Sequence, residues 1–91
     1  MAKHFLLVGC LWVTGVLFGG QDLSFEDHRQ KGIQAYRDGN HDAFFKHMQA
    51  AHELRPDHIG TIYNLAAANA LLKQFDASVA LLQRLADLGL A

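Results

Sequence analysis

The stretch GNHDAFFKHMQAAHELRP, residues 39–56, contains signals for both ends of a helix. Gly39 readily adopts the left-handed conformation that closes a preceding helix. Asn40 or Asp42 can then cap the next helix through a side-chain oxygen. Pro56 pushes the residue before it out of helical geometry. The stretch therefore predicts one helix of about four turns between two breaks.

The same kind of punctuation recurs along the chain. Ser24 with Asp27 is a variant of the capping-box spacing, Asp57 and Asp76 are expected to cap later helices, and Gly89 repeats the role of Gly39. The expected helices run over about 25–38, from the cap at 40 or 42 to about 54, over 58–72, and from 76 to about 88. Turns of a few residues force neighbouring helices to lie antiparallel. The sequence thus predicts an all-α fold of two helical hairpins.

The two hairpins also align with each other. Placing Phe25 and Ile59 at the first position of units of about 34 residues pairs Ala51 with Leu85 and Phe44-Phe45 with Ser78-Val79. We therefore expect repeat one at 25–58 and repeat two at 59–91, within a domain of residues 21–91.

These units resemble the tetratricopeptide repeat family. The matching positions in the first unit are Gly32, Tyr36, Gly39, Asn40, Ala51 and Pro56, and those in the second are Tyr63-Asn64-Leu65-Ala66 and Ser78. The chain departs from the family pattern at Phe44, where alanine is usual, and at Lys73 and Leu90, where glycine and proline are usual. Gly32 is expected to lie opposite Phe44 and so make room for its ring. The resemblance implies a short α-solenoid that binds protein rather than transforming a substrate.

The resemblance also implies which residues face a peptide groove. These residues are Glu26, Arg29, Gln30, Ile33, Tyr36 and Arg37 from the first unit, and Gly60, Tyr63, Asn64, Ala67, Ala70 and Leu71 from the second. Arg29 and Asn64 match two positions with which some family members clamp a terminal carboxylate, whereas Ile33 replaces an asparagine of that clamp. The alternative is that Tyr36 and Tyr63 pack inside the array and that Arg29 is ordinary surface.

Residues 1–20 differ in character from the rest. Lys3 precedes an apolar run, 5–20, that only Thr14 interrupts. At about 1.5 Å per residue the run is shorter than the roughly 30 Å core of a bilayer, which favours a cleaved export signal over a membrane anchor. Lipidation at Cys10 is a third reading. We expect an exported protein that is periplasmic, secreted or anchored at the outer side of the membrane.

Several functional classes are disfavoured by composition. A formal net charge of −1 leaves no basic patch for nucleic acid. The histidines at 41, 47, 52 and 58 are five or six residues apart, so they do not share a helix face as metal ligands at three- or four-residue spacing do. No nucleophile motif or phosphate loop is present in the sequence after residue 20. We expect no catalytic residues, no metal and no cofactor.

The last expected helix is apolar around most of its circumference. A surface helix needs only one apolar stripe, and repeat arrays normally end in a helix with a polar outer face. We expect Leu81, Leu82 and Leu85 to form a partner interface, covered by a second copy, by another protein, or by further chain. The alternatives to a peptide-binding module are therefore a self-associating structural protein and the N-terminal segment of a longer exported enzyme.

Overall fold

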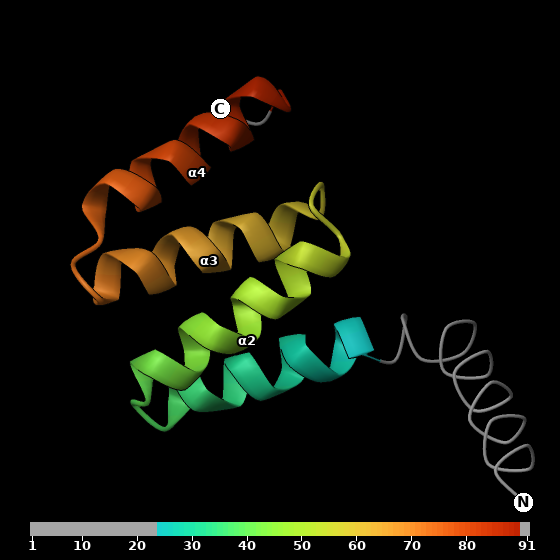
Figure 1. Ribbon diagram of the computed structural model, residues 1–91, viewed down its shortest axis with the longest axis vertical. Coiled ribbons are helices and arrows are strands. Elements are labelled where there is room, and N and C mark those ends of the chain that lie inside the picture. Colours follow the sequence, from blue (N-terminus) through green and yellow to red (C-terminus); the bar gives the residue numbers. More distant parts are fainter. Residues whose placement is uncertain (1–23, 90–91) are drawn as a thin grey trace, which may run out of the picture.

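The computed structural model describes residues 24–89, and within that range the chain is all-helical with no strand. Four helices pack against each other (Figure 1). They are the first helix (24–37), α2 (His41–Leu54), α3 (Ile59–Leu71) and α4 (Phe75–Asp87). The predicted all-α class is confirmed for this range. The export signal or anchor predicted at 1–20 lies outside the described residues.

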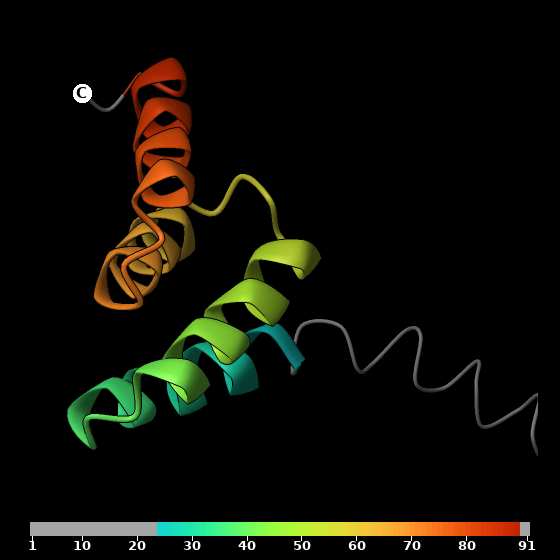
Figure 2. The ribbon, with the colours of Figure 1, turned by 60° about the vertical axis from the view of Figure 1, so that its left-hand side comes forward.

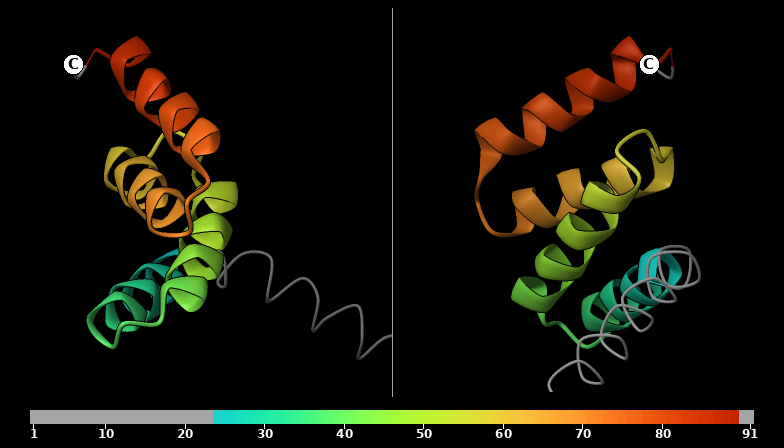
Figure 3. Two further views of the ribbon diagram at one scale, coloured as in Figure 1. Left: turned by 90° about the vertical axis from the view of Figure 1, so that its left-hand side faces the viewer. Right: turned by 45° about the vertical axis from the view of Figure 1, so that its right-hand side comes forward.

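The helices follow one another as two hairpins. The first helix and α2 run in opposite directions, as do α3 and α4, and α3 lies between α2 and α4 (Figures 1 and 2). The two further views in Figure 3 show the same order. Among residues 24–89, none of the helices combines the length and apolar character that crossing a bilayer requires.

Both hairpins turn in the same way. At the first turn Gly39 has a φ of 78°. Its N–H donates a hydrogen bond to the carbonyl of Tyr36 at 3.0 Å, and the N–H of Asn40 donates one to the carbonyl of Ala35 at 2.8 Å. This pair of hydrogen bonds around a left-handed residue is the Schellman motif that closes many helices. The left-handed glycine predicted at position 39 is confirmed.

At the second turn the motif is repeated one unit later. Lys73 has a φ of 63°. Its N–H donates a hydrogen bond to the Ala70 carbonyl at 2.9 Å, and the N–H of Gln74 donates one to the Asn69 carbonyl at 2.8 Å. Lysine therefore occupies a position that normally favours glycine, because a side chain in the left-handed region crowds the backbone. Gly89, at φ 88°, follows the end of α4 as predicted.

The capping predictions were right for α2 and wrong for the next two helices. The Asn40 side chain accepts the Ala43 N–H at 3.1 Å. At α3 the cap is His58, whose Nδ1 accepts the Thr61 N–H at 3.2 Å, and not Asp57. α4 begins at Phe75 after Gln74 without a side-chain cap, so Asp76 lies inside its first turn, where a carboxylate favours the positive end of the helix dipole.

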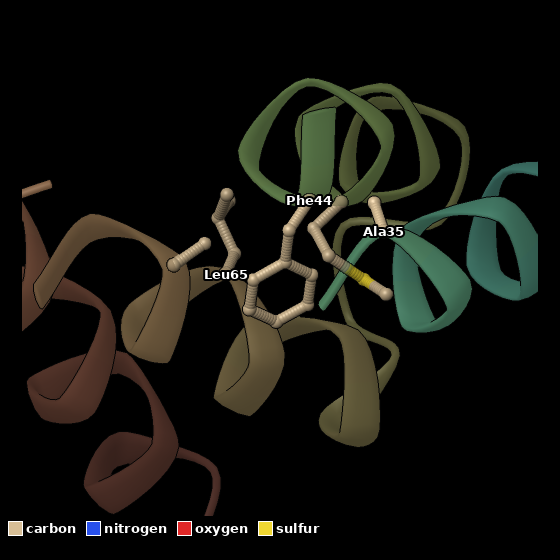
Figure 4. Close-up of a cluster of buried hydrophobic side chains, with 5 residues drawn as sticks. Ala35, Phe44 and Leu65 are labelled. Carbon is tan, nitrogen blue, oxygen red and sulfur yellow. The ribbon is translucent and has the colours of Figure 1, made fainter. Parts of the chain in front are cut away.

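The central core is built from the first three helices. Phe44 of α2 lies between Ala35 of the first helix and Leu65 of α3 (Figure 4). Met48 and Ala68 complete the buried cluster. Phe44 is only 3% exposed, so its ring joins the first hairpin to the second.

The expectation that Gly32 makes room for Phe44 was wrong. A Cβ at Gly32 would lie 2.8 Å from Met48 Cε and 3.2 Å from His47 Cβ. The glycine therefore permits close contact with the next turn of α2, because Phe44 faces Ala35 and α3 instead.

The second hairpin is joined through small residues. Ser78 of α4 is buried, and its Oγ donates a 2.8 Å hydrogen bond to the backbone carbonyl of Ala66. With so little side-chain volume between them, α3 and α4 can approach closely enough for this side-chain-to-backbone bond.

The connection between α2 and α3 holds the ends of the helices around it. The Arg55 guanidinium lies 4.4 Å from the centroid of the buried Phe25 ring, and the His58 ring meets Phe25 edge-on at 4.8 Å. On the same connection Asp57 pairs with Arg84 of α4 at 2.6 Å. The loop therefore contacts both the first helix and the last.

Candidate binding groove

A surface pocket of about 450 Å³ lies between the two hairpins. Its lining comes from the first helix, α2 and α3, namely Ile33, Tyr36, Arg37, Phe44, Tyr63, Asn64 and Ala67. Six of the twelve residues that the resemblance implies face a peptide groove are thus brought together. The seventh lining residue, Phe44, is the one that sequence reasoning missed, because it was read as a misfit in the repeat pattern rather than as the junction between hairpins.

Two tyrosines flank the pocket and remain available to a partner. Tyr36 is 54% exposed and Tyr63 is 60% exposed, although the Tyr36 ring rests on Phe44 with 5.1 Å between centroids. The alternative in which both tyrosines pack inside the array was therefore wrong. Partly exposed tyrosine rings are suited to binding a partner protein. Each supplies a large contact area and a hydroxyl group, and only a few side-chain torsions have to be immobilised.

The charged group on the pocket is Arg37 rather than Arg29. Arg29 is bound to the Glu26 carboxylate of its own helix at 3.0 and 3.2 Å and does not line the pocket. The guanidinium of Arg37 makes no hydrogen bond or ion pair with any other residue in the range 24–89. Asn64 lines the same pocket and is partly exposed. The clamp pair implied by the resemblance, Arg29 with Asn64, is thus not assembled in this pocket, whereas Arg37 and Asn64 are.

A second hollow of about 210 Å³ continues along α3 toward α4. It is lined by Tyr63, Ala66, Ala67, Ala70, Ser78 and Leu82. Tyr63 and Ala67 line both hollows, so Tyr63 stands between them. The two hollows share Tyr63 and Ala67 and are largely apolar, and together they are named here the α3 groove.

The other predicted groove residues, apart from Ala70, line neither hollow. Leu71 is 40% exposed and lines neither hollow, while Glu26, Gln30 and Gly60 are exposed elsewhere on the first helix and α3. Ala70 lines the smaller hollow.

The last helix divides the leucines that were expected to share an interface. Leu81 is half-buried and packs on the central core, Leu85 is half-buried, and Leu82 is exposed in the smaller hollow. The exposed apolar stripe of α4 is Phe75, Val79 and Leu82, which are 60%, 62% and 47% exposed. Their spacing of four and three residues places them on one face of the helix, a signal that was readable from the sequence.

The histidines in the described part of the chain are not arranged as a set of metal ligands. Within residues 24–89, no three or more histidine, cysteine, aspartate or glutamate side chains are placed to share an ion. One histidine pair does form across helices: Nδ1 of His28 lies 3.0 Å from Nδ1 of His47. Sequence reasoning considered only spacings within one helix and so missed this contact.

No protein-family model, curated protein or solved structure matches this chain.

Proposed function

We propose that this chain is a protein-interaction module whose α3 groove binds a peptide or one face of a partner helix. The observation that carries the proposal is the pocket itself, which gathers exposed aromatic side chains, an apolar base and an uncommitted cation between two hairpins. Its volume of about 450 Å³ falls in the range of natural ligand pockets. Anchoring of a partner by one or two large side chains in such a pocket is the usual energetic pattern of interfaces.

The lining also indicates the chemistry of the partner. Phe44 and Ile33 favour an apolar anchor, and the exposed rings of Tyr36 and Tyr63 can enclose it. Arg37, at the same pocket, favours a carboxylate next to that anchor, because a guanidinium binds carboxylates through two parallel hydrogen bonds. The partner segment we infer therefore carries a large apolar side chain beside an acidic group.

A selection experiment tests the groove. A random peptide library displayed on phage is panned on the immobilised protein, and an enriched peptide is titrated by fluorescence anisotropy. We expect Tyr63→Ala to weaken binding by roughly tenfold or more, as truncation of an aromatic anchor does. Leu71→Ala is the matched control, since Leu71 is an exposed α3 residue outside both hollows. Equal affinity for the wild type and Tyr63→Ala would remove the groove as the binding site.

Charge reversal tests the acidic group separately. Arg37→Glu should select against peptides with carboxylates, while Lys46→Glu, an exposed change on α2 outside the pocket, should leave the preference unchanged. If both variants enrich the same peptides as the wild type, Arg37 plays no part in recognition.

The repeat architecture supports the same proposal. Two hairpins closed by matching Schellman turns at Gly39 and Lys73 favour a two-repeat tetratricopeptide-like stack, 25–58 and 59–91. In this proposal the protein is not an enzyme, needs no cofactor and does not bind nucleic acid. It is exported by residues 1–20, whose apolar run is the basis for that part. Mass determination of the exported product tests cleavage, lipidation at Cys10 and chain length together.

A second candidate function is self-association through α4. The exposed stripe of Phe75, Val79 and Leu82 favours it, since a continuous apolar stripe on a helix is stabilised by a covering partner. Sedimentation velocity over a concentration series measures it. A dimer that Val79→Glu converts to a monomer supports this candidate, and a wild-type monomer at all concentrations rejects it.

A further inference from the structure

Two histidine rings meet in the interface between the first helix and α2. Nδ1 of His28 and Nδ1 of His47 are 3.0 Å apart, and the ring centroids are 5.3 Å apart. Both residues are partly buried. A hydrogen bond between these two nitrogens needs one N–H donor and one lone pair, so the pair is satisfied when at least one ring is neutral. With both rings protonated, each nitrogen is a donor and the contact becomes a repulsion between two cations.

Backbone packing keeps the two rings close. One turn after His28 lies Gly32, where a Cβ would come within 3.2 Å of His47 Cβ and 2.8 Å of Met48 Cε. Met48 is fully buried in the core. The helices cannot move apart at His28 and His47 without withdrawing Met48 from the position it fills beside Gly32, because interiors are close-packed.

The charged groups near His28 and His47 do not compensate for the positive charge that a second proton would add. Lys31 adds positive charge, and Asp27, the nearby carboxylate, is paired with Lys31 at 3.0 Å. Burial, followed by the neighbouring His28 and Lys31, lowers the pKa of His47, and Asp27 raises it in part. On the other side of α2 lies α3, which carries no charged side chain. The second proton is therefore favoured when the interface opens.

We propose that acidification opens the first helix away from α2 by protonating both His28 and His47. The consequence for binding rests on the proposed function of the α3 groove. Ile33, Tyr36 and Arg37 reach the groove from the first helix, while Phe44 reaches it from α2. Opening this interface separates those two sets of lining residues, so the groove releases its partner in acid.

The methyl group of Met48 reports on the interface without any ligand. Its Cε lies against Gly32, and the chain has only one other methionine, Met1. The full chain labelled with [¹³C]methyl-methionine is titrated from about pH 7.5 to about pH 5, the range in which histidines change charge. In the wild type we expect an opened-state Met48 signal whose population rises by up to roughly tenfold per pH unit, because opening takes up one further proton.

Two variants and a control make the test specific. His28→Gln and His47→Gln keep a hydrogen-bonding side chain but cannot place two charges in contact, so their Met48 signal should stay constant over the titration. His41→Gln removes a histidine of α2 outside the pair and should titrate like the wild type. A constant Met48 signal in the wild type, including one in which the charged rings swing outward without moving the helices, overturns the proposal. A titration that survives in His28→Gln also overturns it.

The same samples separate this proposal from the groove. Suppose that the opened-state Met48 signal grows in acid as expected. If the wild type then loses a selected peptide in acid while His28→Gln retains it, the link between opening and release is supported. If the wild type binds that peptide equally well at the two ends of the pH range while the opened-state Met48 signal still grows in acid, the link is overturned. Because the Met48 signal needs no peptide, failure of the phage selection leaves the test of opening intact.

Discussion

Gly39 and Lys73 occupy the same left-handed position at the ends of the first helix and α3, with φ 78° and 63°. In each case the N–H of the left-handed residue donates a hydrogen bond to the carbonyl three residues earlier. The N–H of the following residue donates to the carbonyl five residues before its own position. The hairpin turns are therefore equivalent in backbone although their residues differ. In the second turn hydrogen bonding and packing maintain a conformation that lysine by itself disfavours, by roughly 1–2 kcal/mol.

The first prediction concerns these turns. Lys73→Gly should raise the free energy of unfolding by up to about 1 kcal/mol, because the strain disappears while the unfolded chain gains some entropy. Gly39→Ala should lower it by about 1 kcal/mol, and this loss is purely conformational because no atom beyond the adjacent residues lies within 4 Å of the added Cβ. Urea unfolding measures both.

Gly60 provides the control for the turns. It is helical, and its added Cβ would meet only the His58 ring, at 3.4 Å from Cε1 and 3.8 Å from Nδ1, which are ordinary contacts. Gly60→Ala should therefore stabilise the protein by about 0.5–1 kcal/mol. If Gly39→Ala proved as favourable as Gly60→Ala, the left-handed assignment at Gly39 would be wrong.

The second prediction concerns the bond between α4 and α3. Ser78→Ala removes the only donor to the Ala66 carbonyl from outside its own helix within residues 24–89, and should lower the free energy of unfolding by about 1 kcal/mol. Amide exchange along α4 should quicken more than along α2, because the bond holds α4 in place. Gln83→Ala, an exposed change on the same helix, should stay within about 0.5 kcal/mol. An equal response in the two variants would contradict the prediction.

The third prediction separates the cap of α3 from its sequence neighbour. His58→Ala should lose about 1 kcal/mol relative to His58→Asn, because both lose the ring contact with Phe25 but asparagine can still accept the Thr61 N–H. Thermal unfolding of the two variants measures the difference. Asp57→Ala should have little effect, since its carboxylate is exposed and serves only the pair with Arg84. A larger loss in Asp57→Ala than in His58→Ala would restore Asp57 as the cap.

The fourth prediction is the direction of the pH dependence of stability. The pKa of His47 is lowered below its ordinary value of 6.5, mainly by burial. The folded protein then binds fewer protons than the unfolded chain just below pH 6.5. The free energy of unfolding should be highest above that value and should fall as the pH decreases through the lowered pKa. Urea unfolding at a series of pH values measures this slope, and His28→Gln should reduce it. Stability that rises on acidification would contradict the sign.

Helix ends were predictable where the cause lies within a few residues. The left-handed turn at Gly39 and the cap at Asn40 are local hydrogen bonds, and Pro56 stops α2 by a local clash. The cap of α3 was not predicted, because histidine seldom takes this role and His58 is held there by Phe25, which is distant in the sequence.

The repeat resemblance implied part of the lining of the pocket, since six of the residues it names lie there. Which residues point inward was decided by tertiary packing. Phe44 packs between the two hairpins. Leu81 packs against the central core, whereas Leu82 is exposed.

The sequence by itself determined four helices and their turns, because these follow from backbone conformation and helical periodicity. The side that faces a groove was only implied by the repeat resemblance. Only the tertiary structure placed Arg37 rather than Arg29 at the pocket and brought His28 against His47. Both outcomes depend on how closely two helices approach. That distance is set by side-chain volume on both surfaces at once, as at Gly32 against Met48, and no single segment contains that information.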